Sequence, residues 1–159
     1  MSARGSRLVR AIDFYLKNSP LQFDSNIVLS KVKLLSSSDK GAKSSFTVDK
    51  GMCNGGDTLH GGFIAACVDT LSTFAHLGST GKIAWTMNLY VDFIAAAKIG
   101  EEVTAQTLLI RNGNYPVMET IFSKSDGTIV AKGTTSMLNG NDKYQKLVRD
   151  IYNLESDSS

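Results

Sequence analysis

The sequence has little of what several protein classes require. Its 159 residues include two cysteines and two histidines, with no CxxC pair, so neither a disulfide framework nor a zinc site is expected. Seventeen Lys and Arg nearly cancel fifteen Asp and Glu, which argues against a broad basic surface for nucleic acid. The longest apolar stretches, 63–68 and 93–97, are far shorter than the ~20 residues of a membrane span. We therefore predict no metal, no nucleic-acid partner and no transmembrane segment.

Composition and cysteine usage indicate the domain count and the compartment. Hydrophobic residues make up 42% of the chain and charged residues 20%, as in an ordinary globular protein. We expect one domain over 1–159, with a core of about 6–140 and a partly helical C-terminal tail over 141–159. Two isolated cysteines and the absence of an N-x-[ST] acceptor indicate an intracellular protein, in the cytoplasm or the mitochondrion.

The N-terminal part predicts a helix followed by a hairpin. Three arginines near the start are also typical of a mitochondrial presequence, but apolar residues at helical spacing favour a helix over 6–18 that packs on the domain. Pro20 cannot continue that helix. Two extended runs, 27–35 and 43–49, predict a hairpin around a polar turn at 36–41.

The C-terminal half predicts strands joined by tight turns. Gly113 and Gly127 lie in turns that require a positive φ, so the last strands form an antiparallel meander. One sheet wrapped around one buried helix accommodates this pattern, which gives an α+β fold class. The predicted strands cover 83–95, 101–111, 115–125 and 128–138, and a tail helix covers 142–155.

The segment 61–77 carries one carboxylate, Asp69, and neither Lys nor Arg. This composition is typical of a helix buried on most sides, which Gly78 and Gly81 are expected to close. A carboxylate in apolar surroundings needs a partner or changes its pKa. Asp69 therefore either reaches a polar neighbour such as Thr73, lies on a surface stripe, or is kept partly dry so that its pKa rises and it acts as a base or nucleophile.

The approach to this helix combines glycines with an amide and an imidazole. The N–H groups of a first helical turn are free donors, so the backbone at Gly61 can hold a carbonyl oxygen that becomes negative during attack. His60 either belongs to that site or only caps the helix. Asn54 is either a turn former or an amide that positions a water.

The spacing of His60 and Asp69 predicts a second copy of the chain. The two residues are nine positions apart, which on a helix means ~13.5 Å of rise and about half a turn of rotation. They face opposite sides and cannot readily share a site within one chain. If both are catalytic, a homodimer with two composite sites is expected.

Competing motifs are weak. The sequence has no G-x-S-x-G elbow, no P-loop lysine and no G-x-G-x-x-G after a strand, and it implies no cofactor. Cys67 is expected to be a small core residue, and His76 to interact with the last carbonyls of the helix. Trp85 and Met87 are expected to fill the core.

The segment 54–75, NGGDTLHGGFIAACVDTLSTFA, resembles the Asn…T-L-H-G-G…Asp signature of hotdog-fold thioesterases. It is most similar to the group that contains phenylacetyl-CoA thioesterase and acyl-CoA thioesterase 13 (thioesterase superfamily member 2). The similarity extends through TMNLYVDFIAAAKIGEEV at 86–103 and covers roughly 6–140. It implies a curved antiparallel sheet around the central helix. It also implies an enzyme of lipid metabolism that hydrolyses acyl-CoA to a fatty or other carboxylic acid and CoA, at a dimer interface and commonly in a dimer of dimers.

The resemblance also implies roles for matching positions. Asp69 would be the general base or the nucleophile, and Asn54 would hold the attacking water. The Gly61 N–H would polarise the thioester carbonyl, His60 would orient that end of the site, and Thr86 would help with the water. For the CoA moiety the matching positions are Asn88, Phe93, Lys98, Arg111 and Gly113, with the two cationic side chains available to the phosphates.

Three departures from the group's pattern leave other functions open. Asp57 replaces a usual glycine and adds negative charge near the site, Asn88 stands where Asp is common, and Ala96 stands where Pro is common. The alternatives are a non-catalytic acyl-CoA-binding hotdog module and a hotdog enoyl-CoA hydratase or dehydratase. Chain length and head group of the acyl substrate are left open, since the residues that would line a tunnel serve equally as core: Phe63, Phe74, Leu77 and Ile94.

Overall fold

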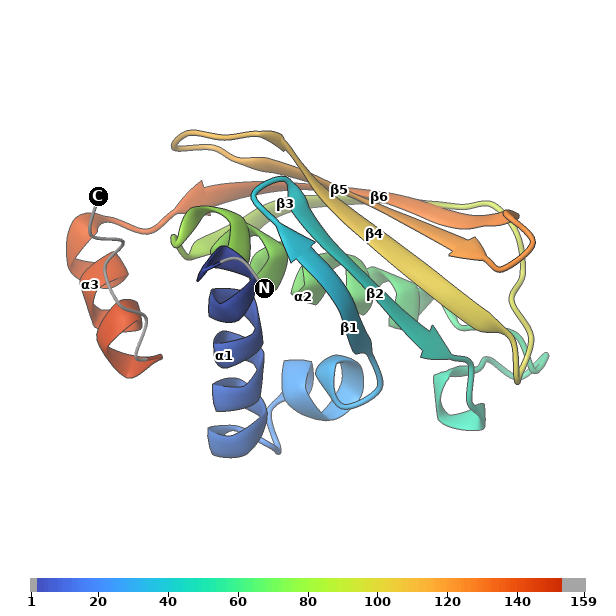
Figure 1. Cartoon of the computed structure of the whole chain (residues 1–159). Coiled ribbons are helices and arrows are strands. Elements are labelled where there is room, and N and C mark those ends of the chain that lie inside the picture. The colour runs from blue at the N-terminus through green and yellow to red at the C-terminus, as the bar shows by residue number, and fades with distance from the viewer. Residues whose placement is uncertain (1–2, 153–159) are drawn as a thin grey trace.

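One antiparallel sheet packs against a long central helix in the computed structural model, which describes residues 3–152 (Figure 1). The strands are β1 (Lys33–Ser38), β2 (Gly41–Thr47), β3 (Ala84–Phe93), β4 (Glu102–Arg111), β5 (Val117–Lys124) and β6 (Ile129–Asn139). The helices are α1 (Ala3–Asn18), α2 (Gly61–Thr80) and α3 (Asp142–Ile151), with a π-helix η1 (Asp24–Leu29) and a 3-10 helix η2 (Lys50–Met52). The predicted α+β class is confirmed.

The spatial order of the strands is β1-β2-β4-β5-β6-β3. The last three strands form the predicted meander, and its hairpin glycines, Gly113 and Gly127, have φ of 113° and 86°. Strand β3 pairs with β6, from Ala84 opposite Asn139 to Phe93 opposite Ala131, and so forms one edge of the sheet. Residues 94–101 then carry the chain from that edge to β4.

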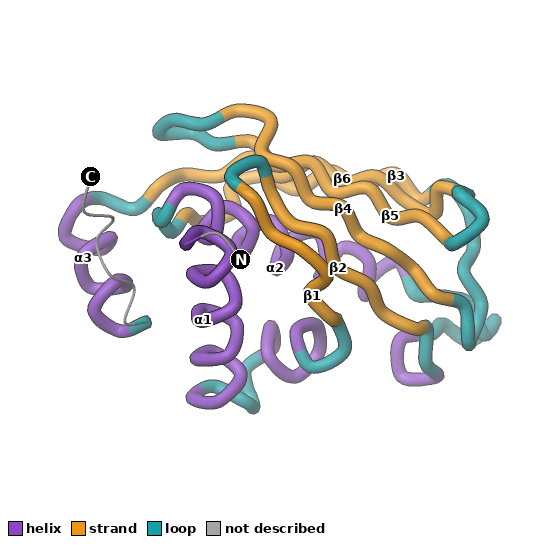
Figure 2. Tube along the Cα trace, in the orientation of Figure 1, coloured by secondary structure: helices purple, strands orange, loops and turns teal. Residues whose placement is uncertain are grey.

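Helix α2 forms the core because the sheet curls around it. Figure 2 shows the sheet as one layer with α1 and α2 against the same side. Cys67 is 0% exposed, as expected of a core residue. On β6, a Cβ at Gly133 would lie 2.5 Å from Val68 Cγ2, so the missing side chain lets the strand approach the helix. Gly81, with φ of 71°, ends α2 and donates its N–H to the Leu77 carbonyl.

The N-terminal hairpin differs from the prediction. Residues 24–29 form η1 rather than a strand, and β1 begins at Lys33. A short apolar run such as the one at 27–29 does not reveal its structure by periodicity alone. Here Thr70 on α2 donates a hydrogen bond to Asp24 Oδ1 at 2.5 Å and holds the turn against the core. Because β1 continues to Ser38, the turn is shorter than predicted.

Two positions expected in the core lie at the surface, and one helix terminus was misplaced. Trp85 and Met87 are 46% and 61% exposed, because β3 is an edge strand. Gly78 lies inside α2, where its missing side chain lets Leu8 of α1 pack closely.

His76 does not bind the last carbonyls of α2. It is fully buried, and its Nε2 atom lies 2.8 Å from Asn139 Oδ1 on β6. Burial lowers the pKa of His76, so the neutral imidazole is favoured.

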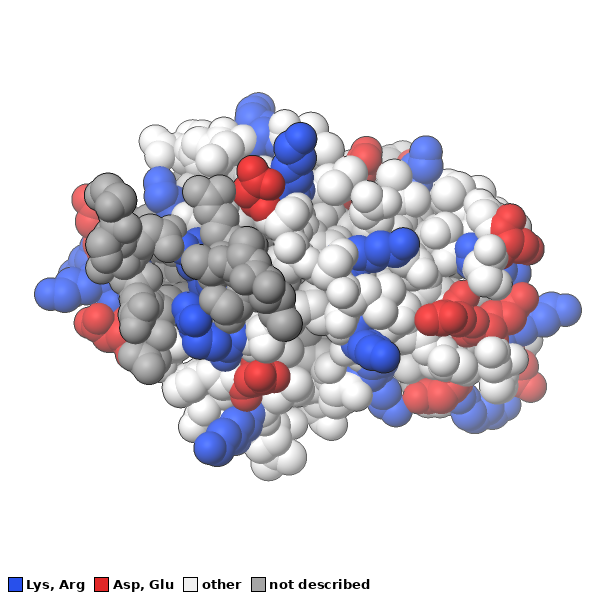
Figure 3. Space-filling model, viewed as in Figure 1, with Lys and Arg blue, Asp and Glu red and all other residues white. Residues whose placement is uncertain are grey.

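The surface carries both signs of charge. Figure 3 shows Lys and Arg interspersed with Asp and Glu across the face in view. Within residues 3–152, no helix has the length and apolar character to cross a membrane. The tail helix is confirmed over 142–151, whereas its predicted end at 155 lies outside the described residues.

Candidate active site

Asp69 and Thr86 meet across the contact between α2 and β3. Asp69 lies in the middle of α2 and is partly buried. The Thr86 hydroxyl donates a short hydrogen bond to Asp69 Oδ1. Of the polar neighbours considered from the sequence, the strand residue Thr86 is the bonded partner rather than Thr73 on the same helix. The contact fixes the direction of the carboxylate and leaves its second oxygen available to a ligand.

A cavity of about 450 Å³ opens in front of this pair. Asp69 and Thr86 form one wall, and Phe74 and Leu77 of α2 continue it. Trp85 of β3 also lines the cavity, and the other walls come from Tyr15 of α1, Asp24 of η1, Tyr144 of α3 and Tyr152 directly after α3. A carboxylate in a partly enclosed cavity next to a hydroxyl can accept a proton from a bound water.

Asn54 is used within its own loop. Its Oδ1 accepts hydrogen bonds from the Gly56 N–H at 2.9 Å and from the Thr58 hydroxyl at 3.2 Å, and its Nδ2 lies 3.0 Å from Thr58 Oγ1. The side chain is exposed and makes the hydrogen bonds expected of a turn former, while its role toward a water stays a prediction.

His60 caps α2. Its Nδ1 accepts a hydrogen bond from the Gly62 N–H at 2.7 Å, so a neutral His60 carries its proton on Nε2. This is the capping alternative considered from the sequence.

The N–H of Gly61 lies in the first turn of α2, where helix geometry provides no intrahelical acceptor. A Cβ at Gly61 would lie 3.1 Å from the ring of Phe93, so the glycine lets this ring pack closely against the start of the helix. The two residues share an open cavity of about 340 Å³ with Asn54, Leu59 and residues 94–96. A carbonyl oxygen placed here would accept the free N–H.

The structure therefore brings the predicted catalytic residues together as two half-sites. We call Asp69 with Thr86 the acid half-site, and Asn54, His60 and Gly61 the amide half-site. Each half-site opens into a different cavity. Within one chain the two halves do not meet, as the helical spacing predicts.

The predicted CoA residues divide in the same way. Phe93 lies at the end of β3 beside Gly61, and the Lys98 backbone forms a β-bridge with Thr58. Gly113 lies at the opposite end of β3, because its carbonyl accepts a hydrogen bond from Asn139, the partner of Ala84. Nine strand steps separate the two ends, which is about 30 Å.

The two remaining CoA positions lie on different strands, Arg111 at the end of β4 and Asn88 on the edge strand β3. Arg111 is in the β4–β5 hairpin and donates to the Tyr115 carbonyl at 3.1 Å. Asn88 is exposed on β3, next to a bulge after Thr86.

Asp57, which adds negative charge where the resembled group has glycine, pairs with Lys50. It has φ of 58°, in the left-handed region that favours glycine, which fits the residue type usual at this position. Its carboxylate forms a short ion pair with Lys50 Nζ, and this contact raises the pKa of Lys50. The charge of Asp57 is thus directed to a lysine on η2.

Sequence reasoning missed the aromatic walls of the acid half-site. The rings of Trp85 and Tyr144 of α3 are in tilted contact with centroids 4.2 Å apart, and Tyr15 of α1 stacks on Tyr152 at 6.3 Å. The amphipathic pattern of the tail indicated its helix, but no signal in the pattern placed that helix beside Asp69.

This fold and site define a class. A sheet wrapped around one helix, with a carboxylate in the middle of that helix and a free N–H at its start, is the arrangement of the hotdog fold. The thioesterase superfamily model matches residues 56–115, a segment that contains Asp69 and Thr86. The mouse protein acyl-coenzyme A thioesterase 13 is 28% identical over 117 residues, which cover 72% of this chain and 84% of that protein. Residues 56–115 are thus similar to the thioesterase superfamily, and 72% of the chain is similar to a protein named as an acyl-CoA thioesterase.

Solved structures of thioesterases and of a related protein have the same fold as this chain. Zebrafish thioesterase superfamily member 2 superposes with a TM-score of 0.76 at 27% identity, covering 83% of this chain and 96% of that one. The PaaI protein of E. coli, from the phenylacetic acid degradation operon, has a TM-score of 0.74 at 18% identity over 87% of this chain and 97% of its own. A Streptococcus pneumoniae thioesterase structure with coenzyme A has a TM-score of 0.69 at 19% identity, over 80% of this chain and 94% of its own. The last two likenesses concern the fold.

Proposed function

We propose that the protein hydrolyses acyl-CoA thioesters to a carboxylic acid and CoA. Asp69 takes a proton from a water that attacks the thioester carbon, or attacks that carbon itself, and Thr86 holds the carboxylate in place. The Gly61 N–H stabilises the oxygen that becomes negative in the tetrahedral intermediate. The C–S bond then breaks, and the CoA sulfur takes up the proton that Asp69 removed from the water. If Asp69 itself attacks, breaking the C–S bond gives an acyl–Asp69 anhydride and a CoA thiolate. A water then hydrolyses the anhydride to the carboxylic acid, which restores the Asp69 carboxylate and supplies the proton for the thiolate. Asn54 positions the water, and His60 orients the helix start through its cap.

The observation that carries this proposal is the pairing of a partly buried carboxylate with a free helix N-terminal N–H, divided between two half-sites. Hydrolysis needs both at one thioester, so the active form is a dimer in which each site takes one half from each chain. The edge strand β3 supports such a partner, because its apolar side chains are exposed. Met87, Tyr90 and Phe93 are 61%, 61% and 59% exposed. A dimer of dimers would repeat the same composite site.

The relatives support the substrate class. The mouse relative is named an acyl-coenzyme A thioesterase, and the S. pneumoniae protein is bound to coenzyme A. In the dimer, Asn88, Phe93, Lys98, Arg111 and Gly113 would surround the CoA moiety, with Lys98 and Arg111 facing its phosphates. We further propose that 1–159 forms one domain. Because Cys53 and Cys67 are free thiols, we propose an intracellular location, in the cytoplasm or the mitochondrion.

The test is a thiol-release assay across short, medium, long and aromatic acyl-CoA esters. Asp69→Asn preserves the size of the side chain and a carbonyl acceptor for Thr86, and it should lower kcat by about 10²- to 10⁴-fold. Asp39→Asn, an exposed aspartate in the β1–β2 turn, is the matched control and should keep wild-type activity. Near-normal hydrolysis by a folded Asp69→Asn protein would contradict the mechanism.

A specific observation also favours a second candidate, a non-catalytic acyl-CoA-binding module. The Asn54 amide is engaged within its own loop, and Asp57 lies three residues away. Binding of S-alkyl-CoA thioethers in calorimetry, without thiol release from any ester, would support this module over the hydrolase.

A further inference from the structure

The cavity of the acid half-site is walled on one side by the C-terminal helix α3. Gln145 of α3 is buried and clamps the helix to the start of β3. Its Oε1 accepts the Ile83 N–H at 2.9 Å, and its Nε2 donates to the Ile83 carbonyl at 2.7 Å. A helix anchored by two hydrogen bonds to one backbone residue has a defined position beside the site.

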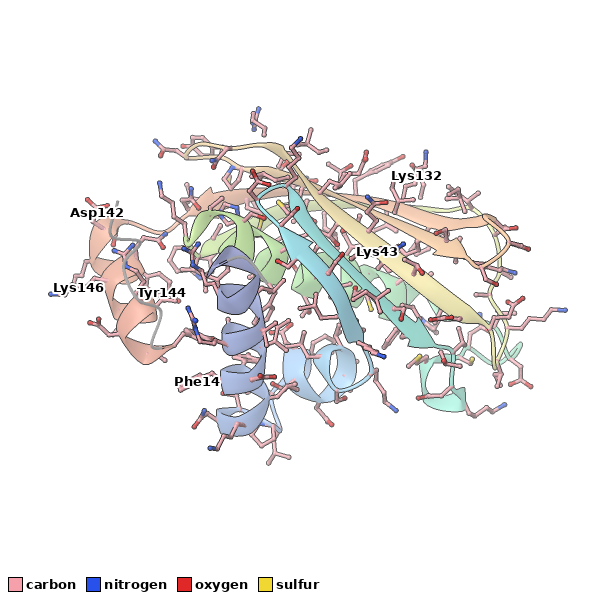
Figure 4. The ribbon with its side chains drawn as sticks, in the orientation of Figure 1. Phe14, Lys43, Lys132, Asp142, Tyr144 and Lys146 are labelled. Atoms are coloured by element: carbon pink, nitrogen blue, oxygen red, sulfur yellow. The ribbon has the colours of Figure 1, made fainter. Side chains whose placement is uncertain are left out.

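Two tyrosines of this segment face inward. Figure 4 shows Tyr144 on the side of α3 toward α1, with Asp142 and Lys146 on its outer side. A Cβ at Gly140 would lie 2.8 Å from the Tyr144 ring and 3.1 Å from Trp85. The glycine before the helix therefore makes room for the contact between these two rings. Tyr152 packs against Phe14 of α1 with ring centroids 5.4 Å apart.

The charged side chains that line the described part of the cavity are all acidic. Asp24 and Asp69 both line it, and none of its described lining residues is Lys, Arg or His. Asp24 lies behind Tyr15, whose hydroxyl is 3.5 Å from Asp24 Oδ2. Burial, together with the charges of its neighbours, raises the pKa of Tyr152 to about 12, so its hydroxyl stays neutral.

We propose that the acyl group of the substrate occupies this cavity, that Tyr144 and Tyr152 set the length of chain it accepts, and that Asp24 excludes acyl groups ending in a carboxylate. This inference rests on the proposed function, because it places the acyl group next to Asp69. The substrate class is an uncharged acyl group. A dicarboxylic acyl group would place its second carboxylate between two aspartates, with no cation among the described residues that line the cavity.

The size arm measures binding, so it does not depend on turnover. Calorimetry with S-alkyl-CoA thioethers of increasing length should show affinity rising about fourfold per methylene until the cavity is filled, and then a plateau. Tyr144→Ala and Tyr152→Ala should move the plateau to longer chains, whereas Tyr144→Trp should move it to shorter ones. Lys146→Ala, on the outer side of the same helix, is the control and should keep the wild-type profile. Tyr144→Trp adds volume to the cavity wall, so it tests the role of that wall even if an alanine variant displaces α3 from the domain.

The charge arm compares S-butyl-CoA with S-(3-carboxypropyl)-CoA. The wild-type protein should bind the butyl thioether at least about tenfold more tightly, and Asp24→Asn should reduce that preference. The asparagine keeps an acceptor for Thr70, so η1 should stay in place.

The outcomes separate this inference from the hydrolase proposal. Thiol release by the wild-type protein, with the same chain-length plateau in all tyrosine variants and an unchanged preference in Asp24→Asn, would overturn the acyl cavity and leave the hydrolase standing. A plateau that moves as expected, without thiol release, would support the acyl cavity and overturn the hydrolase. Failure of every thioether to bind would overturn both.

Discussion

The two half-sites differ in how much of each is already built within one chain. The acid half-site is enclosed: Asp69 is partly buried, Thr86 binds it, and two further helices wall its cavity. The amide half-site is open, with Asn54 and His60 both exposed and both bonded to their own backbone neighbours. The difference shows that the surroundings of the carboxylate are formed by the fold of one chain, whereas the backbone donor at Gly61 faces an open cavity that a second chain would have to cover in the proposed dimer.

The largest effect is expected when each half-site is disabled in a different chain and the two chains are then mixed. Asp69→Asn and Gly61→Val should each be nearly inactive, because the valine side chain would fill the space beside the ring of Phe93. Mixed and allowed to exchange subunits, they should regain roughly a quarter of wild-type activity, since half of the dimers are mixed and each has one intact site of two. The thiol-release assay measures the mixture against each variant alone. A mixture no more active than its parts would show that each chain works by itself.

The next largest effect concerns Asn54. Asn54→Ala should slow turnover by about ten- to a hundredfold if the amide positions the water. Thr58→Ala removes the partner of the amide within the loop and keeps the amide itself, so its kcat should fall by less than about threefold. Equal losses in the two variants, measured by steady-state kinetics, would mean that Asn54 only shapes the turn.

Burial of His76 in the core predicts that the stability of the protein depends on pH. Because the pKa of buried His76 lies below its ordinary value of 6.5, the unfolded chain binds the proton more readily than the folded one. The free energy of unfolding should therefore fall as the pH drops below about 6.5. Urea denaturation between about pH 7 and pH 5.5 measures the effect. His76→Gln should flatten the dependence, and His60→Gln at the open half-site should retain it; the opposite pattern would contradict the burial argument.

The smallest effect is expected at Asp57. Lys50 already pairs with its carboxylate, so Asp57→Gly should change kcat/KM by less than about threefold. The glycine also suits the positive φ at this position. A tenfold gain in kcat/KM in the thiol-release assay would show instead that the aspartate charge reaches the substrate.

Several features were predictable because they depend on local chemistry. The apolar composition of 61–77 predicted the central helix, and the glycines at 113 and 127 predicted the hairpins. The assignment of Ile27 to a strand was wrong, because a short apolar run fits a buried helical turn equally well. Trp85 was misplaced for a different reason: large apolar residues suit a core, and only the position of β3 at the sheet edge exposes this one.

By itself the sequence determined which residues are candidates for the chemistry and that His60 and Asp69 face opposite ways, because helical spacing fixes direction along a continuous helix. Only the tertiary structure decided that Thr86 binds Asp69, that β3 lies at an edge, and that α3 walls the cavity. Those contacts join segments far apart in the chain. They depend on the strand order and on the packing of helices, which local patterns of residues do not specify.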